Sequence, residues 1–340
     1  MLSSRVVRCF LVLCVGLGPG TPPPLRTPTR SQANGAPAAD TLFAFKSNFW
    51  VNLHHFLYLL ARAHRGAGDS ANPAVLDAPG DTAGLGSLTT KERAGWARAL
   101  AYYDTALAGR DISFDSTIVD VNYALSGMES TTILLPNPGI QPGLAAALAA
   151  AAPAYRRALW PRHDRANRAW TASMQPLLHE SGDTIARQLE KIYRVPWPRR
   201  EAPVQVVAYA KWGGAYTTLY PPLITMGSLY AGHRGTLGLE QIFHEASHSM
   251  MDSVNAALRA AGVEPWGDQG RNAAHAIIFY TAGEVVRRVA PTHTPYAEWR
   301  HLWTETSLRQ YRTALTKDWE RYLDGKGTLR DAVAAIAQSR

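Results

Sequence analysis

Two histidines four residues apart, with a glutamate directly after the first, are the residues of this chain best suited to chemistry. They form the segment His244-Glu245-Ala246-Ser247-His248. Residues four apart on a helix lie one above the other, so both imidazoles can point a nitrogen at one ion about 2 Å away. Glu245 would lie beside that ion, where a carboxylate can take a proton from an activated water. The segment therefore predicts a metal site with hydrolytic chemistry.

The residues around this segment predict that it lies on a helix packed in the core. Apolar side chains recur at helical spacing at Leu239, Ile242, Phe243, Ala246, Met250 and Val254. Two histidines and a glutamate on the inward side of such a helix are costly to bury unless they hold something. The alternative is an incidental motif on a solvated helix face.

A catalytic zinc needs a third protein ligand, with one position left open for water. The downstream candidates are Asp252, His275 and Glu284. Asp252 lies one turn beyond His248, too far along the axis to complete the site, and is expected to support it from outside. His275 and Glu284 are nine residues apart, about half a revolution on one helix, so only one of them can face the metal. We expect Glu284, because Gly283 beside it permits a close approach of the two helices; His275 is the alternative.

His244, Glu245, His248 and Glu284 together resemble the zincin metallopeptidases, in the gluzincin branch, where a glutamate from a following helix completes the HExxH site. The resemblance is confined to the motif and covers about residues 203–290. It departs from thermolysin-like enzymes, because Gly283 precedes the glutamate where they have Asn, and Arg288 follows it by four residues where they have Asp.

The resemblance implies a Zn²⁺ cofactor held by His244, His248 and Glu284, Glu245 as general base, and a peptide or protein substrate. A group that stabilises the oxyanion is also required. The candidates for it are Tyr280, His275, His233 and Tyr311.

Two other functions fit the same residues. One is an exported zinc protein that binds peptides or uses the metal structurally, without catalysis; an intact Glu245 argues against it. The other is a zinc hydrolase of a non-peptide amide or ester.

The N-terminus has the pattern of an export signal. Arg5 and Arg8 precede a short apolar run, and Ser31-Gln32-Ala33 offers a cleavage site. We expect a signal peptide over 1–33, a linker over 34–42, and a periplasmic or secreted mature protein. Cys14 is a candidate lipidation site, which Leu13 before it disfavours. Both cysteines of the chain lie in the signal, so the mature protein has no disulfide.

Charge and hydropathy exclude other classes. Four of the 35 basic residues, and none of the 27 acidic ones, lie in 1–33, and the rest are dispersed. Dispersed charge does not support nucleic-acid binding. No apolar stretch is long enough for a stable membrane span.

Periodicity predicts a predominantly helical α+β fold, with a helical N-terminal region over 43–200 and a zincin-like catalytic region over 201–340. A small antiparallel sheet or hairpin is expected before the HExxH helix, with a strand over 204–209 and its partner over 216–220 and 223–226. Pro221 and Pro222 mark the second strand as an edge strand.

His54 and His55, within the first helix, are expected to be structural unless one faces the cleft. Helices are expected over 43–65, 90–107, 113–127, 143–159, 161–193, 272–289, 298–323 and 329–338.

Overall fold

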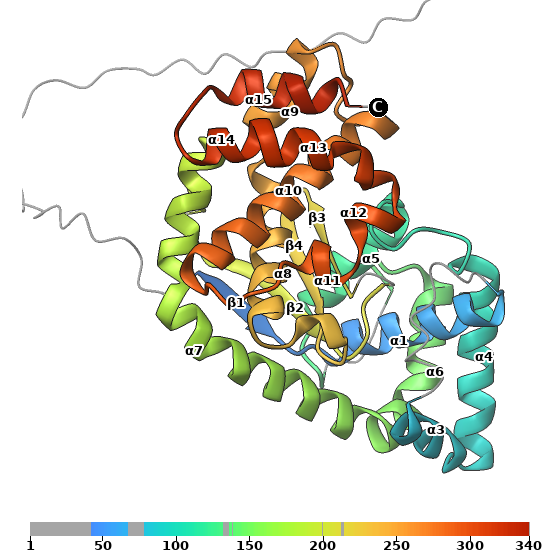
Figure 1. The fold of residues 1–340 in the computed structure, drawn as a ribbon. Coiled ribbons are helices and arrows are strands. Elements are labelled where there is room, and N and C mark those ends of the chain that lie inside the picture. The colour runs from blue at the N-terminus through green and yellow to red at the C-terminus, as the bar shows by residue number, and fades with distance from the viewer. Residues whose placement is uncertain are drawn as a thin grey trace, which may run out of the picture. The chain divides into compact units, whose positions relative to one another are not determined.

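The computed structural model describes residues 42–66, 78–131, 136–137, 139–198, 200–211 and 214–339. All of them belong to one compact unit, Ala36–Arg340. The predicted signal peptide, Cys14 and nearly all of the predicted linker lie outside the described residues. Most described residues are helical, which confirms the predominantly helical α+β class (Figure 1).

The first predicted helix, over 43–65, begins later than expected. Residues Phe43–Lys46 form strand β1, and helix α1 covers Phe49–His64. The start of α1 is set by Asn48, whose side-chain oxygen accepts bonds from the backbone N–H groups of Trp50 and Val51. The other helices of this half are α3 (Pro79–Gly86), α4 (Thr90–Ala106), α5 (Ser116–Ser126), α6 (Pro142–Ala158) and α7 (Trp160–Tyr193).

The described residues contain one mixed four-stranded sheet, in the order β1-β2-β4-β3. Its strands after β1 are β2 (Ala202–Val207), β3 (Ala215–Leu219) and β4 (Pro222–Gly227). β2 pairs in parallel with both β1 and β4, whereas β3 and β4 are antiparallel. The sheet is therefore mixed and not antiparallel, and the expected pairing of the strand over 204–209 with 216–220 is wrong, because β2 pairs with β4 and β3 is not its neighbour. The hairpin joins β3 to β4 through the Tyr220–Pro221 turn, because the two prolines end one strand and begin the next. β3 is an edge strand.

The two faces of the sheet belong to two different hydrophobic clusters. Val206 packs into a cluster with Phe243 and the later helices, whereas the adjacent Val207 packs into a cluster built on α1, α4 and α6. Successive strand residues point to opposite faces, so β2 contributes to both. The long helix α7 packs against α8 (Gly235–Ser247), which carries the motif, and α8 in turn contacts β3 and β4 (Figure 1).

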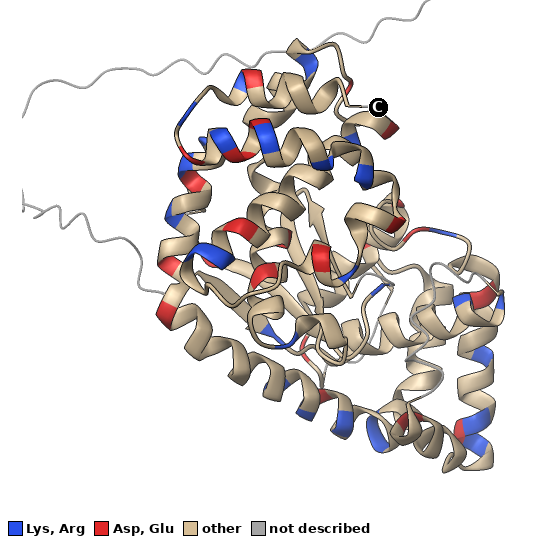
Figure 2. Cartoon of the chain, in the orientation of Figure 1, with Lys and Arg blue, Asp and Glu red and all other residues tan. Residues whose placement is uncertain are grey.

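Helices also form most of the chain after α8. The predicted helix over 298–323 is divided into short segments, and the backbone turns at His301, which adopts a left-handed φ of 54°. No helix in the described ranges is long and apolar enough to cross a membrane. Figure 2 shows both signs of charge spread over many of the helices. The remaining α-helices are α9 (Asp252–Ala260), α10 (Asp268–Val289), α11 (Tyr296–Trp299), α12 (Leu302–Glu305), α13 (Arg312–Ala314), α14 (Glu320–Leu323) and α15 (Leu329–Ala337). The 3₁₀ turns are η3 (Ala231–His233), η4 (His248–Met250) and η5 (Ser307–Tyr311), and η6 (Leu315–Trp319) is a π-helical turn.

Candidate metal centre

The predicted HExxH helix ends within its own motif. α8 carries His244 and Glu245, and the backbone tightens into the 3₁₀ turn η4 at His248. The Ser247 hydroxyl donates to the Phe243 carbonyl (2.7 Å), and the Ser249 hydroxyl donates to the Ala246 carbonyl (2.8 Å). Serine hydroxyls that bond the carbonyls of the preceding turn disturb a regular helix. The apolar stripe expected to run on to Val254 is thus divided between α8 and α9.

Three histidines converge at this turn. His275, from α10, joins His244 and His248, and the ligand atoms of the three residues all lie within 4.8 Å of one another. The ring centroids are 5.2 Å apart for His244 and His248, 5.2 Å for His248 and His275, and 5.1 Å for His244 and His275. The three rings therefore form a nearly equilateral group that could hold a metal ion.

Glu284 does not belong to this group. Its carboxylate pairs with Arg287 one turn along α10. Because His275 and Glu284 are half a revolution apart on a regular helix, the helix that brings His275 to the histidines turns Glu284 away from them. The structure thus places His275, the alternative, where the sequence led us to expect Glu284.

Gly283 does serve a close approach, as expected. A Cβ at this position would lie 2.8 Å from Cβ of Pro295 and 3.3 Å from a carboxylate oxygen of Glu240, which is on α8. The missing side chain therefore lets α10 and the segment before α11 pack against α8. The contacts that Gly283 permits are with Pro295 and Glu240, and they do not bring the neighbouring Glu284 to the histidines.

The chemistry of the three imidazoles fits a first-row metal ion. Burial, followed by the charge of the neighbouring histidines, holds the pKa of His244 well below its usual range. Burial likewise lowers the pKa of His248 to about 3 and that of His275 to about 4. Neutral imidazoles keep a nitrogen lone pair free for a metal. Two nitrogens bound to a tetrahedral zinc lie about 3.3 Å apart, and Nε2 of His244 lies 3.2 Å from Nε2 of His275.

Aromatic packing fixes the orientation of two of these rings. Phe279, one turn after His275 on α10, stacks on the His275 ring with centroids 4.7 Å apart, and its centroid is 4.1 Å from that of His244. Tyr296 stacks on the other side of Phe279 at 5.9 Å. Ligands held in place before binding lose less entropy when the metal arrives.

Glu245 is placed as the sequence predicts, beside the histidines and almost fully buried. Its Oε2 lies 3.9 Å from Nε2 of His248 and accepts a hydrogen bond from the Thr217 hydroxyl (2.8 Å). Burial raises the pKa of Glu245 to about 7, against the lowering effects of the Thr217 bond and the Lys211 charge. A carboxylate with that pKa is suited to accept and return a proton near neutral pH.

A cavity of about 530 Å³ opens over the three histidines and Glu245. Its walls come from the edge strand β3, from the loop before α5, and from α10 and the segments that follow. The polar groups on these walls include Lys211, between β2 and β3, and Asp111 and Ser113, before α5. Lys211 was not singled out in the sequence, because one lysine in a loop carries no local pattern that distinguishes it.

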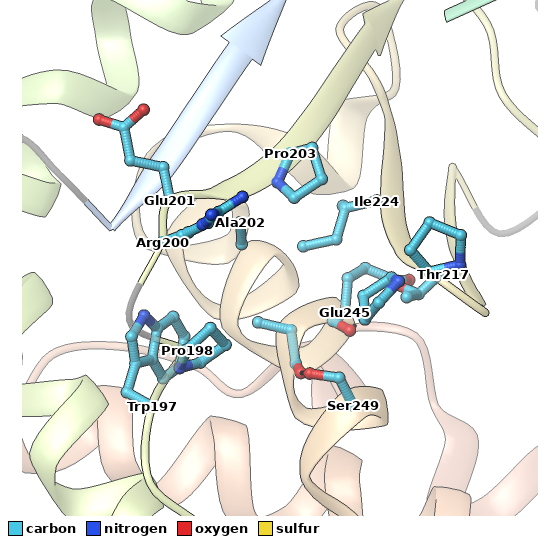
Figure 3. A pocket seen from close by; sticks show the side chains of 13 residues that line it. Trp197, Pro198, Arg200, Glu201, Ala202, Pro203, Thr217, Ile224, Glu245 and Ser249 are labelled. Carbon is cyan, nitrogen blue, oxygen red and sulfur yellow. Dashed lines mark hydrogen bonds between the residues drawn. The ribbon is translucent and has the colours of Figure 1, made fainter. Parts of the chain in front are cut away.

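A second cavity, of about 400 Å³, shares Thr217 and Glu245 with the first. Figure 3 shows it between the segment before β2, with Trp197 and Pro198, and the turn η4 that follows α8, with Ser249. Its lining is largely apolar. The Thr217–Glu245 pair thus borders both spaces.

The other candidates for oxyanion stabilisation lie away from the histidines. The His233 ring bonds the Gly227 carbonyl (2.8 Å), the Tyr280 hydroxyl donates to Glu320 (2.7 Å), and the Tyr311 hydroxyl donates to the Gln269 carbonyl (3.2 Å). Each of these three side chains is therefore engaged in a hydrogen bond to a neighbouring element.

The remaining histidine and aspartate candidates have structural surroundings. His54 and His55 are both buried in α1, where His54 bonds the Tyr103 hydroxyl (2.8 Å) and His55 bonds the Tyr216 hydroxyl (2.9 Å). Asp252 is exposed in the first turn of α9.

A comparison with known proteins found no match: no family model, no curated protein and no solved structure matches the chain.

Proposed function

We propose that this chain is an exported, zinc-dependent peptidase. The observation that carries the proposal is the group of three histidines, of which His244 is buried, with Glu245 directly beside it at the floor of a cavity. In this proposal His244, His248 and His275 are the three protein ligands. A catalytic zinc is typically held by three protein ligands with a fourth position open to water.

A zinc ion bound there would supply Lewis acidity, which polarises a carbonyl and lowers the pKa of a water molecule to about 7. Glu245 takes the proton of the attacking water and later delivers it to the leaving nitrogen. The Thr217 hydroxyl holds Oε2 of Glu245 while it does so. The lowered pKa values of the three histidines keep them neutral, which leaves Glu245 as the proton carrier of the site.

A peptide substrate is favoured by the strand that borders the site. β3 is an edge strand, and Thr217 in that strand also donates to the Glu245 backbone carbonyl (2.9 Å). An extended peptide can add to such an edge by main-chain hydrogen bonds. The cavities that meet at Thr217 and Glu245 offer room for the chain on both sides of a scissile bond.

The test is the hydrolysis of fluorescently labelled casein and of a mixed peptide library by the purified, zinc-loaded protein. Glu245→Gln is expected to retain its zinc and to lose activity by about 10²- to 10⁴-fold, the usual contribution of a general base. Glu180→Gln, at an exposed position of α7, is the matched control and should keep wild-type activity. A wild-type protein with one zinc that cleaves neither substrate would contradict the proposal, and cleavage of an ester such as p-nitrophenyl acetate alone would favour a non-peptide hydrolase.

A further inference from the structure

Lys211 is a partly buried cation in the wall of the metal cavity, and the proposed mechanism does not use it. It follows β2, and its ammonium donates to the Ser113 hydroxyl. Nζ lies 5.2 Å from the ring centroid of Phe114 and 5.8 Å from that of Tyr216. An ammonium has three donors, and the bond to Ser113 uses one of them. Among the described residues Ser113 is its only hydrogen-bond partner, which leaves two donors for a molecule in the cavity that Lys211 lines.

The charges around Lys211 connect it to the reacting centre. Burial lowers the pKa of Lys211, whereas the negative charges of Asp111 and Glu245 raise it and the positive charge of Arg62 lowers it. Lys211 in turn lowers the pKa of His248 and His275, after the effect of their burial. Its field therefore acts on the ligands and on the proposed base.

The partly buried ammonium of Lys211 is only partly compensated by the charges of the protein. Ser113, its direct partner, is neutral, and the Ser113 hydroxyl is itself bonded to Oδ1 of Asp111 (2.6 Å). A charge removed from water is costly unless it is paired. A ligand with negative charge in the cavity would complete the compensation.

Attack of water on a carbonyl produces such a charge. The water oxygen bonds to the carbonyl carbon, the π pair of the C=O bond moves onto its oxygen, and the water proton passes to Glu245. When that pair returns, the C–N bond breaks and the nitrogen takes the proton from Glu245. A donor aimed at the developing negative oxygen typically contributes 10²- to 10³-fold to the rate.

Two other cations among the described residues that line the cavity have side-chain partners of their own. Arg271 pairs with Asp268 at an exposed position, and Arg300 bonds Tyr296. Lys211 is the cation whose charge reaches both Glu245 and the histidines.

We propose that Lys211 is a catalytic residue of this site, whose ammonium binds the scissile carbonyl oxygen and the negative charge that develops on it. The inference rests on the proposed hydrolytic function. It assigns the oxyanion role that Tyr280, His275, His233 and Tyr311 leave open. In this role Lys211 acts as a cationic hydrogen-bond donor, and Glu245 alone carries the proton.

The test uses the full-length protein loaded with Co²⁺ and inorganic phosphate as a tetrahedral anion probe, titrated by the change in the visible cobalt spectrum. Lys211→Met is expected to raise the phosphate Kd at least tenfold, while Lys211→Arg stays within threefold of wild type. Lys46→Met, which removes an exposed lysine paired with Glu129, is the control and should leave the Kd unchanged. An unchanged Kd in Lys211→Met would overturn the inference.

A purely structural role, in which Lys211 only bonds Ser113, would give a different result. Lys211→Gln keeps a hydrogen-bond donor without the charge. If the role were structural, Lys211→Gln would keep the wild-type phosphate Kd, whereas an oxyanion role predicts that this variant still loses phosphate affinity. This variant also decides the question if Lys211→Met does not fold. On labelled casein, we expect a kcat loss of about 10²-fold in Lys211→Gln with KM within threefold. A wild-type protein that binds no Co²⁺ would overturn the proposed function itself, whereas one Co²⁺ per chain with unaltered phosphate binding in Lys211→Gln would overturn only the role of Lys211.

Discussion

Asp81 is fully buried and joins helices α3 and α7 to the segment that leads to Lys211. Its Oδ1 accepts a bond from Nε2 of His163 (2.9 Å) and lies 3.3 Å from Nη1 of Arg162, and its Oδ2 accepts from the Tyr209 hydroxyl. The Tyr155 hydroxyl bonds the other nitrogen of His163 (2.8 Å). Tyr209 lies two residues before Lys211, so this network holds the wall of the cavity.

Asp81→Ala removes both acceptor oxygens and leaves two buried donors without a partner. Each unpaired buried donor costs about 1–3 kcal/mol, and breaking a buried ion pair from one side costs about 3–5 kcal/mol. We therefore expect Asp81→Ala to lower the free energy of unfolding by about 4 kcal/mol at pH 7, as measured by urea denaturation of the metal-free protein.

The pH dependence gives this prediction a second readout. Burial raises the pKa of Asp81, but the bond and charge of His163 and the bond of Tyr209 outweigh it and hold the pKa below its ordinary value. A depressed carboxyl pKa stabilises the fold above the unfolded-state pKa, near 3.8, and this contribution is lost as the pH falls through the folded-state pKa. The difference between wild type and Asp81→Ala should therefore shrink below about pH 4.

Asp104→Ala is the matched control, because Asp104 forms an exposed pair with Arg65. Such a pair contributes about 0–1 kcal/mol. If Asp81→Ala were no more destabilising than Asp104→Ala, the reasoning about the buried network would be refuted.

Three further predictions concern the packing and the metal. Gly283→Val should lower the free energy of unfolding by about 2 kcal/mol in urea titrations, because its Cβ would lie 2.8 Å from Cβ of Pro295; wild-type stability would contradict the close approach. Tyr216→Phe removes the hydroxyl that bonds His55 and Asn122 and should cost about 1–3 kcal/mol in the same assay, whereas an unchanged midpoint would show that these bonds contribute nothing. Chelation of the metal should lower the thermal midpoint, since zinc at a hundredfold excess over its Kd stabilises the fold by about 2.7 kcal/mol, and a midpoint insensitive to chelator would argue against a site formed by the fold.

The sequence predicted the parts of the site that are close together in the chain. The spacing of His244, Glu245 and His248 is enough to place all three on one turn, and the structure brings them together. Most helices were also predicted within a few residues, because their apolar periodicity is strong over many turns. α7 is an example, at Trp160–Tyr193 against the predicted 161–193.

The parts that depend on contacts between distant segments were not predicted. Periodicity cannot say which face of α10 meets α8, so His275 and Glu284 were both open. Gly283 favoured Glu284, whereas the contacts of the glycine lie at Pro295 and Glu240 and the structure groups His275 with the other two histidines. Parallel pairing of β2 with β1 and β4 joins residues far apart in the chain and leaves no local signal. Lys211 becomes distinctive only when folding brings Ser113 and the histidines to it.

Zinc K-edge X-ray absorption on the purified wild-type protein reports the ligands around the metal and so examines the three-histidine centre itself. We expect one zinc per chain with three imidazole nitrogens at about 2.0–2.1 Å and one further oxygen from water. Loss of the metal from His275→Ala, with full retention in Glu284→Ala, would assign the third imidazole. A zinc held by two imidazoles and a carboxylate that disappears in Glu284→Ala, or a protein that binds no zinc, would contradict the three-histidine centre.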